Sequence, residues 1–527
     1  MTPDARRGAW RGAAGAILVA ALTVLVFWPC LRLGLVDLDD PVNLAPAALG
    51  RAGASLSWLF SNVCCNYSPV SQSTFAADFA LWGGAPLGYH LTSVLLHAAN
   101  AAAFYALCLE LFAAGRPSGR DRLGAAAAAL LFALHPLRVQ SVAWVSGRRD
   151  VVCGLFFLLT LLCWLRAQRP GEARAGRWRA GALALFLLAL LSKAAALALP
   201  PVLVLLSVHP LGRPPASPRR WSGEAARAVW RETAPFFALA AAFAPVAVLG
   251  RSQCGAFVGL ARALPAQRAR QILIGLVFYT GKTLWPSGLS LYEWNWAPIR
   301  SATWLGAAAT AGLIAAAVVS RRLRPHLLAA LGYQTLMLAP TLAATFGHEI
   351  VADRYSYLSG LAWAALAGAG LRGLSPRRRL PGTAVLAAAL ILCAVLTRAQ
   401  ASVWTDSTSL WRQVLRVDPM SWGARPNLAE AVLKEGRLGE GVLLLEEQLR
   451  VYPDDAQVRE ALARLIASTK TTARDHARFH AELGREFAER GEFVKAAWHF
   501  ERALRYDPES TALRAELDAA RAAAVAR

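Results

Sequence analysis

Charged residues and cysteines are both scarce in this sequence. Only 17% of its 527 residues are charged, 56% are hydrophobic, and the mean hydropathy is +0.37. This composition excludes one ordinary soluble domain and indicates a membrane protein with an attached part. Of the eight cysteines, most lie inside apolar runs as small packing residues, so no disulfide framework is predicted. Two alternatives stay open for Cys64, Cys65 and Cys254: a disulfide bridge, or unpaired thiols.

Acidic residues are few in the first three quarters of the chain. Residues 1–400 hold 37 Lys+Arg against 14 Asp+Glu, a net charge of +23, whereas residues 401–527 hold 19 against 20, a net charge of −1. The basic residues form short clusters between apolar stretches, a pattern that orients membrane helices. We therefore expect membrane lipids, and no nucleic acid, among the partners.

Apolar runs long enough to cross a bilayer recur along residues 1–403. A crossing needs about 20 apolar residues, and we predict about eleven crossings, two of them short. The candidates are 14–32, 88–112, 123–139, 150–166, 180–192, 195–208, 233–250, 302–319, 326–345, 353–372 and 380–399. The first run lacks a cleavage signal and is expected to remain as a helix.

Arginine clusters occur on alternate connections, which places the N-terminus in the cytoplasm. The same alternation predicts that 180–208 crosses twice, turning near Lys193, and that 272–287 lies along or dips into the outer face. The protein is thus expected in a bacterial inner membrane or the endoplasmic reticulum, with residues 404–527 outside the cytoplasm.

The C-terminal segment 404–527 changes to amphipathic helices with an internal repeat. Asn427-Leu428-Ala429, Gly436 and Tyr452-Pro453 recur, 55 residues later, as Glu482-Leu483-Gly484, Gly491 and Asp507-Pro508. Two helices with a turn glycine in a unit of about 34 residues are typical of tetratricopeptide repeats. We predict units at 421–454 and 477–510 with a leading half-repeat at 404–420. Such an array either binds a protein or peptide or serves as a folded spacer.

Acids and arginines from several loops converge on the predicted outer face. The stretch LVDLDDPVNL holds Asp37, Asp39 and Asp40 directly after the first apolar run. An acid can act as a general base toward a hydroxyl, and arginine binds phosphate, so the combination suits group transfer from a lipid phosphate. A capped or solvated loop is the structural alternative for the acid pair. No metal-ligand spacing defines a metal site, and the need for a divalent metal stays open.

Several motifs together resemble one family of membrane enzymes. They are LDDP, NYSP followed by LWGGAPLGYHLTSVLLH, LFALHPLRVQSVAWVSGRRD, LLSK, GKTLWP, ADRYSYL and WTDSTSLWRQVL. The sequence resembles the GT-C fold membrane glycosyltransferases, and most closely the transmembrane and tetratricopeptide repeat O-mannosyltransferase group and its bacterial relatives. The resemblance implies an all-α polytopic domain followed by extracytoplasmic repeats.

The resemblance also implies an activity and a set of site residues. The enzyme would transfer a hexose, mannose in the first place, from a polyprenyl or dolichyl phosphate to a protein or other envelope acceptor, with inversion at the anomeric carbon. Asp39 and Asp40 match the paired acids of the family and would be catalytic. The implied substrate-binding residues are Arg354, Arg149, Asp353, Tyr355, His90, His135, Arg138 and Tyr67.

Three positions depart from the family pattern. Ser68, Gln140 and Ala194 stand where relatives carry an arginine and two acids. These losses keep a second hypothesis open, a non-catalytic scaffold whose repeats recruit envelope or lumenal proteins. A transporter is a third possibility, because intramembrane charges also mark translocation paths.

Overall fold

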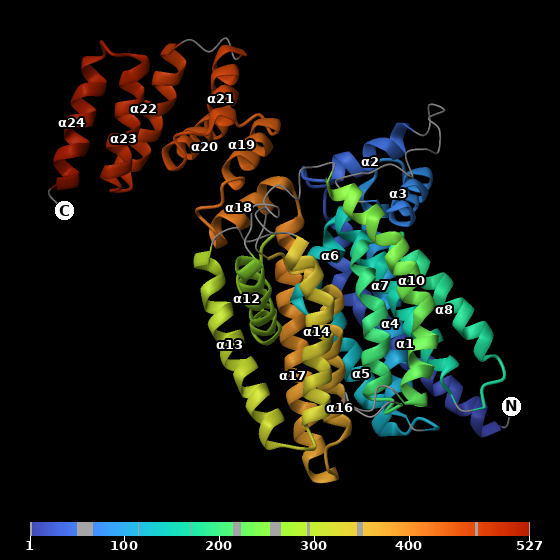
Figure 1. Ribbon diagram of the computed structural model, residues 1–527. Helices are drawn as coiled ribbons and strands as arrows, with labels where there is room; N and C mark the ends of the chain where they lie inside the picture. Colours follow the sequence, from blue (N-terminus) through green and yellow to red (C-terminus); the bar gives the residue numbers. More distant parts are fainter. Residues whose placement is uncertain are drawn as a thin grey trace. The chain divides into compact units, whose positions relative to one another are not determined.

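The computed structural model describes residues 3–49, 67–113, 115–169, 171–213, 223–252, 265–291, 296–344, 351–468 and 473–525. These residues form helices and their connections, with no β-strand in the described ranges (Figure 1). The helices divide into two compact units, Met1–Ser421 and Trp422–Arg527. Cys64, Cys65 and Cys254 lie outside the described residues, whereas Cys30, Cys108, Cys153, Cys163 and Cys393 are free thiols.

The first unit is a helical bundle with short 3₁₀ segments (η) at its turns. Its α-helices are α1 (Pro3–Phe27), α2 (Asp40–Leu49), α3 (Pro69–Trp82), α4 (Pro86–Phe112), α5 (Gly119–Ala133), α6 (Val139–Ala143), α7 (Arg148–Ala167), α8 (Ala175–Leu190), α9 (Leu199–Val208), α10 (Glu224–Ser252), α12 (Pro265–Leu284), α13 (Trp296–Val319), α14 (Arg324–Ala344), α15 (Ser356–Ser359), α16 (Leu361–Arg372), α17 (Pro376–Ala401) and α18 (Ser407–Val417). The 3₁₀ segments are η1 (Trp28–Arg32), η4 (Pro136–Arg138), η5 (Val145–Gly147), η6 (Ala194–Ala198), η8 (Asp353–Tyr355) and η9 (Ser402–Trp404).

The protein is a multi-pass membrane protein. By length and composition, six helices in the described part of the chain are apolar enough to cross a bilayer, and a seventh forms if Gly119–Ala133 and Pro136–Ala143, bent by 56°, count as one. The sequence predicted about eleven. Four predicted crossings account for the difference. The helices α8, α9 and α16 have 16, 10 and 12 residues, all shorter than a bilayer requires, whereas α14 has 21 residues but is not among the helices that are apolar enough.

Small residues allow some of these helices to approach closely. A Cβ atom on Gly368 of α16 would lie 2.3 Å from the carbonyl oxygen of Gly124 on α5, and one on Gly124 would lie 2.7 Å from the carbonyl of Gly368. Reciprocal glycines of this kind bring two backbones into direct contact, as in other membrane helix pairs. In Figure 1, α5 and α16 lie at the same end of the bundle, where α4 and α7 also end.

The segment after the last long helix belongs to the first unit. The sequence analysis placed the domain boundary at 404, whereas the compact units meet after Ser421. Trp404 stacks on Trp144, the Ser407 hydroxyl accepts a hydrogen bond from the Asp37 amide at 2.7 Å, and Gln413 donates to the Leu289 carbonyl. The predicted half-repeat 404–420 therefore packs on the membrane domain because its tryptophan and α18 cover that surface.

The second unit contains α19 (Ala424–Lys434), α20 (Leu438–Val451), α21 (Ala456–Ser468), α22 (Ala473–Glu489), α23 (Phe493–Tyr506) and α24 (Thr511–Val525). Gly436 and Gly491 join α19 to α20 and α22 to α23 with φ of 79° and 74°. Only glycine adopts this left-handed conformation without a steric cost. The two hairpins thus share one turn geometry, 55 residues apart, which supports the repeat interpretation.

Candidate active site

Asp40 is buried and holds the first loop in place. Its carboxylate accepts hydrogen bonds from the Ser146 amide at 2.9 Å, the Ser146 hydroxyl at 2.6 Å and the Val36 amide at 3.1 Å. Asn43 donates to the same Ser146 hydroxyl at 2.8 Å. Burial raises the pKa of Asp40 to about 6, although the hydrogen bonds from Ser146 and Val36 lower it. One carboxylate oxygen therefore connects the loop to η5, and the other closes a turn within the loop itself.

Asp39 is the more accessible acid of the pair. Its side chain is 35% exposed, and one oxygen lies 3.5 Å from Nη2 of Arg149. Arg149, the second residue of α7, is 8% exposed, and its buried Nη1 has no hydrogen-bond partner among the described residues. A buried guanidinium nitrogen without an acceptor is costly, so this arginine is suited to an oxyanion ligand.

Two further cations surround this pair. Nζ of Lys193 lies 2.6 Å from the Asp150 carboxylate. Burial is the largest cause that lowers the pKa of Lys193; Asp150 raises it, and the nearby charges of Arg354 and Arg149 lower it. Lys193 thus has two like charges in its surroundings and one carboxylate beside it, and a further anion near these cations would reduce the repulsion between them.

Arg354 is positioned by aromatic rings and by Gln140. Its guanidinium carbon lies 5.7 Å from the ring centre of Trp144 and 5.0 Å from that of Tyr355, and Nη2 donates to the Tyr355 hydroxyl at 3.4 Å. The Gln140 side chain accepts from the Arg354 amide and donates to the Leu291 carbonyl, both at 2.7 Å. A carboxylate at position 140 could not donate the second bond, which gives the amide there a structural reason.

The other residues predicted for the site occupy structural positions. His90 bonds through Nε2 to the Gly34 carbonyl at 3.1 Å. His135 uses both ring nitrogens, one accepting from the Leu137 amide and the other bonded to the Thr283 carbonyl. Arg138 donates to the Ser356 carbonyl at 2.6 Å. These contacts fix the backbone around the charged side chains.

Two further predicted residues are Asp353 and Tyr67. Asp353 is buried at the start of η8, where its carbonyl accepts the Ser356 hydroxyl. The ring of Tyr67 lies 6.3 Å from that of Phe243 on α10, and no contact in the described ranges joins it to Asp39. The structure thus pairs Asp39 with Arg149 and Arg354 with Tyr355, and it adds an ion pair of two residues that lie in the motifs quoted above but were not among the predicted site residues.

Those two residues are Lys193 and Asp150. The sequence analysis used Lys193 only as the turn between two apolar runs. A lone lysine flanked by apolar residues carries a signal, because such a charge must find a partner when it is buried. Its partner was not deducible, since Asp150 lies 43 residues earlier.

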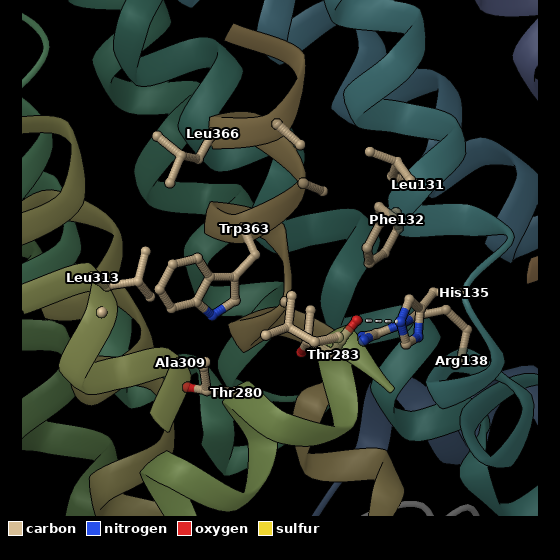
Figure 2. Close-up of a pocket in the computed structure, with 15 residues that line it drawn as sticks. Leu131, Phe132, His135, Arg138, Thr280, Thr283, Ala309, Leu313, Trp363 and Leu366 are labelled. Carbon is tan, nitrogen blue, oxygen red and sulfur yellow. Dashed lines mark hydrogen bonds between the residues drawn. The ribbon is translucent and has the colours of Figure 1, made fainter. Parts of the chain in front are cut away.

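An apolar cavity lies next to η4, the segment that carries Arg138. It has a volume of about 540 Å³ and is bounded by α5, η4, α12, α13 and α16. Figure 2 shows Trp363, Leu313 and Leu366 along one part of it and Leu131 and Phe132 along another, with His135 and Arg138 at one end. Arg138 belongs to η4, two residues before Gln140, so one short segment faces both the cavity and Arg354.

A Xenopus laevis protein named protein O-mannosyl-transferase tmtc2 is 40% identical over 101 residues, which are 19% of this chain and 11% of that protein. Drosophila melanogaster protein O-mannosyl-transferase Tmtc3 is 24% identical over 480 residues, 77% of this chain and 51% of that protein. The chain is similar in sequence to protein O-mannosyl-transferases. It spans about a tenth to a half of the length of these relatives, and no family model matches it.

Solved structures with related helix arrangements are more distant. ArnT from Cupriavidus metallidurans bound to undecaprenyl phosphate aligns with a TM-score of 0.40 and 17% identity over 89% of this chain and 80% of that one. The archaeal oligosaccharyltransferase AglB from Archaeoglobus fulgidus, in complex with an inhibitory peptide and a dolichol-phosphate, aligns with a TM-score of 0.43 and 14% identity over 75% and 56%.

Proposed function

We propose that the protein is a membrane glycosyltransferase that moves a hexose, mannose in the first place, from a polyprenyl or dolichyl phosphate to a protein or other acceptor outside the cytoplasm. The observation that carries the proposal is the arrangement of Asp39 beside Arg149, with Lys193 and Arg354 close by. The names of the sequence relatives support the sugar and the class of reaction.

In the proposed reaction Asp39 is the general base. Its half-exposed carboxylate takes the proton from the acceptor hydroxyl, and the resulting oxygen forms a bond to the anomeric carbon. The bond between that carbon and the phosphate oxygen breaks, and the lipid phosphate leaves with the electron pair. One displacement of this kind inverts the anomeric carbon and needs no covalent enzyme intermediate.

The cations would bind the phosphate that leaves. Arg149 has a buried nitrogen without a partner in the described structure, and Arg354 is stacked between aromatic rings that hold it in one orientation. Positive charges placed where negative charge develops lower the barrier without reorganising during the reaction. No group of three or more His, Cys, Asp or Glu in the described ranges could hold a metal ion, and these cations supply the charge in our proposal.

The carrier chain would lie in the apolar cavity of Figure 2. That cavity is walled by Leu131, Leu313, Trp363 and Leu366, and its Arg138 end adjoins η8, which carries Arg354. Burying an isoprenoid chain against such a surface is favourable in proportion to the apolar area covered. The phosphate would then remain at the charged end and the sugar would point toward Asp39.

The second unit would hold a protein acceptor. A groove of about 840 Å³ runs along α19, α20 and α21 and is lined by Trp422, Asn427, Leu433 and Ala461, among others. Grooves with a mixture of apolar and polar side chains suit extended peptide segments. The proposed extracytoplasmic position of this unit follows from the arginine distribution.

The deciding experiment is a transfer assay with the purified protein and dolichyl phosphate mannose. Asp39→Asn should reduce transfer by about 10²-fold or more, since general bases contribute at least that much. Asp37→Asn is the matched control, because Asp37 is an exposed acid two residues away in the same loop. Equal activity of the Asp39 variant and the control would favour the non-catalytic scaffold.

The groove is tested with two substitutions on one helix. Ala461→Trp fills the groove, whereas Ala463→Trp places the same side chain on the exposed face of α21. We expect Ala461→Trp alone to reduce transfer to a folded protein acceptor while transfer to a short peptide is kept. Equal loss with both acceptors would mean that the repeats are structural.

A further inference from the structure

A second apolar cavity lies at the other end of the bundle from Asp39. It has a volume of about 320 Å³ and is walled by α4, α7, α9, α14 and α16. Most of its lining is aliphatic or aromatic: Leu107, Leu161, Leu205, Ala330, Leu361 and Ala365 are examples. The proposed reaction gives this cavity no role.

The distance along α7 separates it from the candidate active site. Arg149 begins that helix beside Asp39, and Leu161 is three turns further on. Twelve residues of α-helix span about 18 Å. A phosphate bound in this cavity is therefore not the phosphate of a donor held at Arg149.

Polar and basic groups collect at one end of this cavity. Nε2 of His209 lies 2.9 Å from Nδ1 of His326, and the two rings meet edge to face at 4.7 Å. In a neutral pair, the ring that accepts this bond keeps an N–H on its other nitrogen. Arg372 also lines the cavity, is 42% exposed, and donates through Nε to Asp121 at 2.5 Å.

These groups have the charge and the donors for an anionic head group. The Asp121 bond uses one of the five N–H donors of the Arg372 guanidinium. The arginine clusters assign this end of the bundle to the cytoplasmic side, where basic pockets between membrane helices bind the head groups of anionic lipids. The aliphatic walls match an acyl chain that enters from the bilayer.

We propose that this cavity binds an anionic phospholipid, with one acyl chain between α9, α14 and α16 and the phosphate beside His209, His326 and Arg372. The occupant is a bilayer lipid and not the sugar carrier, because its phosphate would lie beside these side chains, whereas the proposed donor holds its phosphate at Arg149, about 18 Å away along α7. The lipid would fill the space that these helices enclose. It would therefore stabilise the helical bundle in membranes with an anionic inner surface.

The test is native mass spectrometry of the purified full-length protein in detergent with added phosphatidylglycerol or phosphatidylcholine of the same chain length. We expect phosphatidylglycerol to be retained at least about fivefold better, and the double variant His209→Ala/His326→Ala to reduce its retention by about fivefold. Ala365→Phe fills the cavity and should abolish retention. Ala387→Phe, at an exposed position on α17, is the matched control and should retain the lipid.

Three results would overturn the proposal. They are equal retention of the two phospholipids, equal retention by the two phenylalanine variants, and displacement of phosphatidylglycerol by an equimolar amount of undecaprenyl phosphate. The readout is independent of sugar transfer, so a protein without transferase activity can still pass or fail this test.

Discussion

Replacing Asp78 and Asp39 by asparagine should have different effects. We expect Asp78→Asn to reduce the stability of the protein and Asp39→Asn to reduce sugar transfer. Asp78 and Arg148 form a buried ion pair of 2.6 Å, with side-chain exposures of 4% and 0%. Arg148 also donates to the Tyr89 carbonyl at 2.6 Å and lies 4.7 Å from the ring centre of Phe75. Asp78→Asn would leave this buried cation without its counter-charge.

The expected magnitude follows from burial. Removing one partner of a buried ion pair costs about 3–5 kcal/mol, because the other charge stays uncompensated. Asp39→Asn removes a contact of 3.5 Å at a side chain that is 35% exposed, and such pairs contribute about 0–1 kcal/mol. Asp78→Asn should therefore lower the free energy of unfolding by several times more than Asp39→Asn, while Asp39→Asn should lower transfer without a comparable loss of stability.

The assay is denaturant unfolding of both variants in detergent, followed by tryptophan fluorescence. The double variant Asp78→Asn/Arg148→Met should recover a large share of the loss, because it contains no buried charge at this place. A single Asp78→Asn protein as stable as the wild type would refute the reasoning, and so would a double variant less stable than the single one.

Three further predictions concern the first loop, the phosphate and the carrier. Burial raises the pKa of Asp40 from its usual value near 4 to about 6, so the stability that this group contributes is complete below about pH 4 and is lost as the pH rises through 6. The free energy of unfolding, measured from pH 4 to 7.5, should therefore show this decrease in the wild type, and Asp40→Asn should lack it. Arg354→Lys keeps the charge but loses the stacking on Trp144, and steady-state kinetics should show a KM for the lipid donor raised about tenfold, with a smaller change in kcat; an unchanged KM would contradict the proposed contact. Ala309→Phe fills the cavity of Figure 2 and should impair long-chain donors more than a short-chain donor, whereas Ala308→Phe, exposed on the same helix, should impair neither; equal effects of the two in a competition assay would contradict the carrier site.

Hydropathy was sufficient to predict the helical membrane domain. The number of crossings was not, because α8, α9 and α16 are too short to cross a bilayer and α14 is not among the helices that are apolar enough. The repeat was visible in sequence since two glycines must adopt a left-handed conformation at matching positions. Its boundary was not, because the stacking of Trp404 on Trp144 joins residues 260 positions apart.

The acid pair shows where sequence reasoning ends. Asp39 and Asp40 are neighbours with the same chemistry, and nothing in LDDP distinguishes them. Asp40 is buried and accepts two hydrogen bonds from Ser146, 106 residues later. In the same way, His135 and Arg138 look like ligands in a loop, yet their partners are the carbonyls of Thr283 and Ser356. Long-range partners decide which polar residue is left for chemistry.

The hydrogen bond between Asp37 and Ser407 also has a consequence for biosynthesis. Its two residues are 370 positions apart, and a ribosome that adds about 5–20 residues per second needs about 20–70 s to make that length of chain. During this interval the first loop exists without the segment that fixes it. The nascent protein therefore has no finished site until its last membrane helix is inserted, and a ribosome that stalls before Ser407 would release a chain whose first loop lacks this contact.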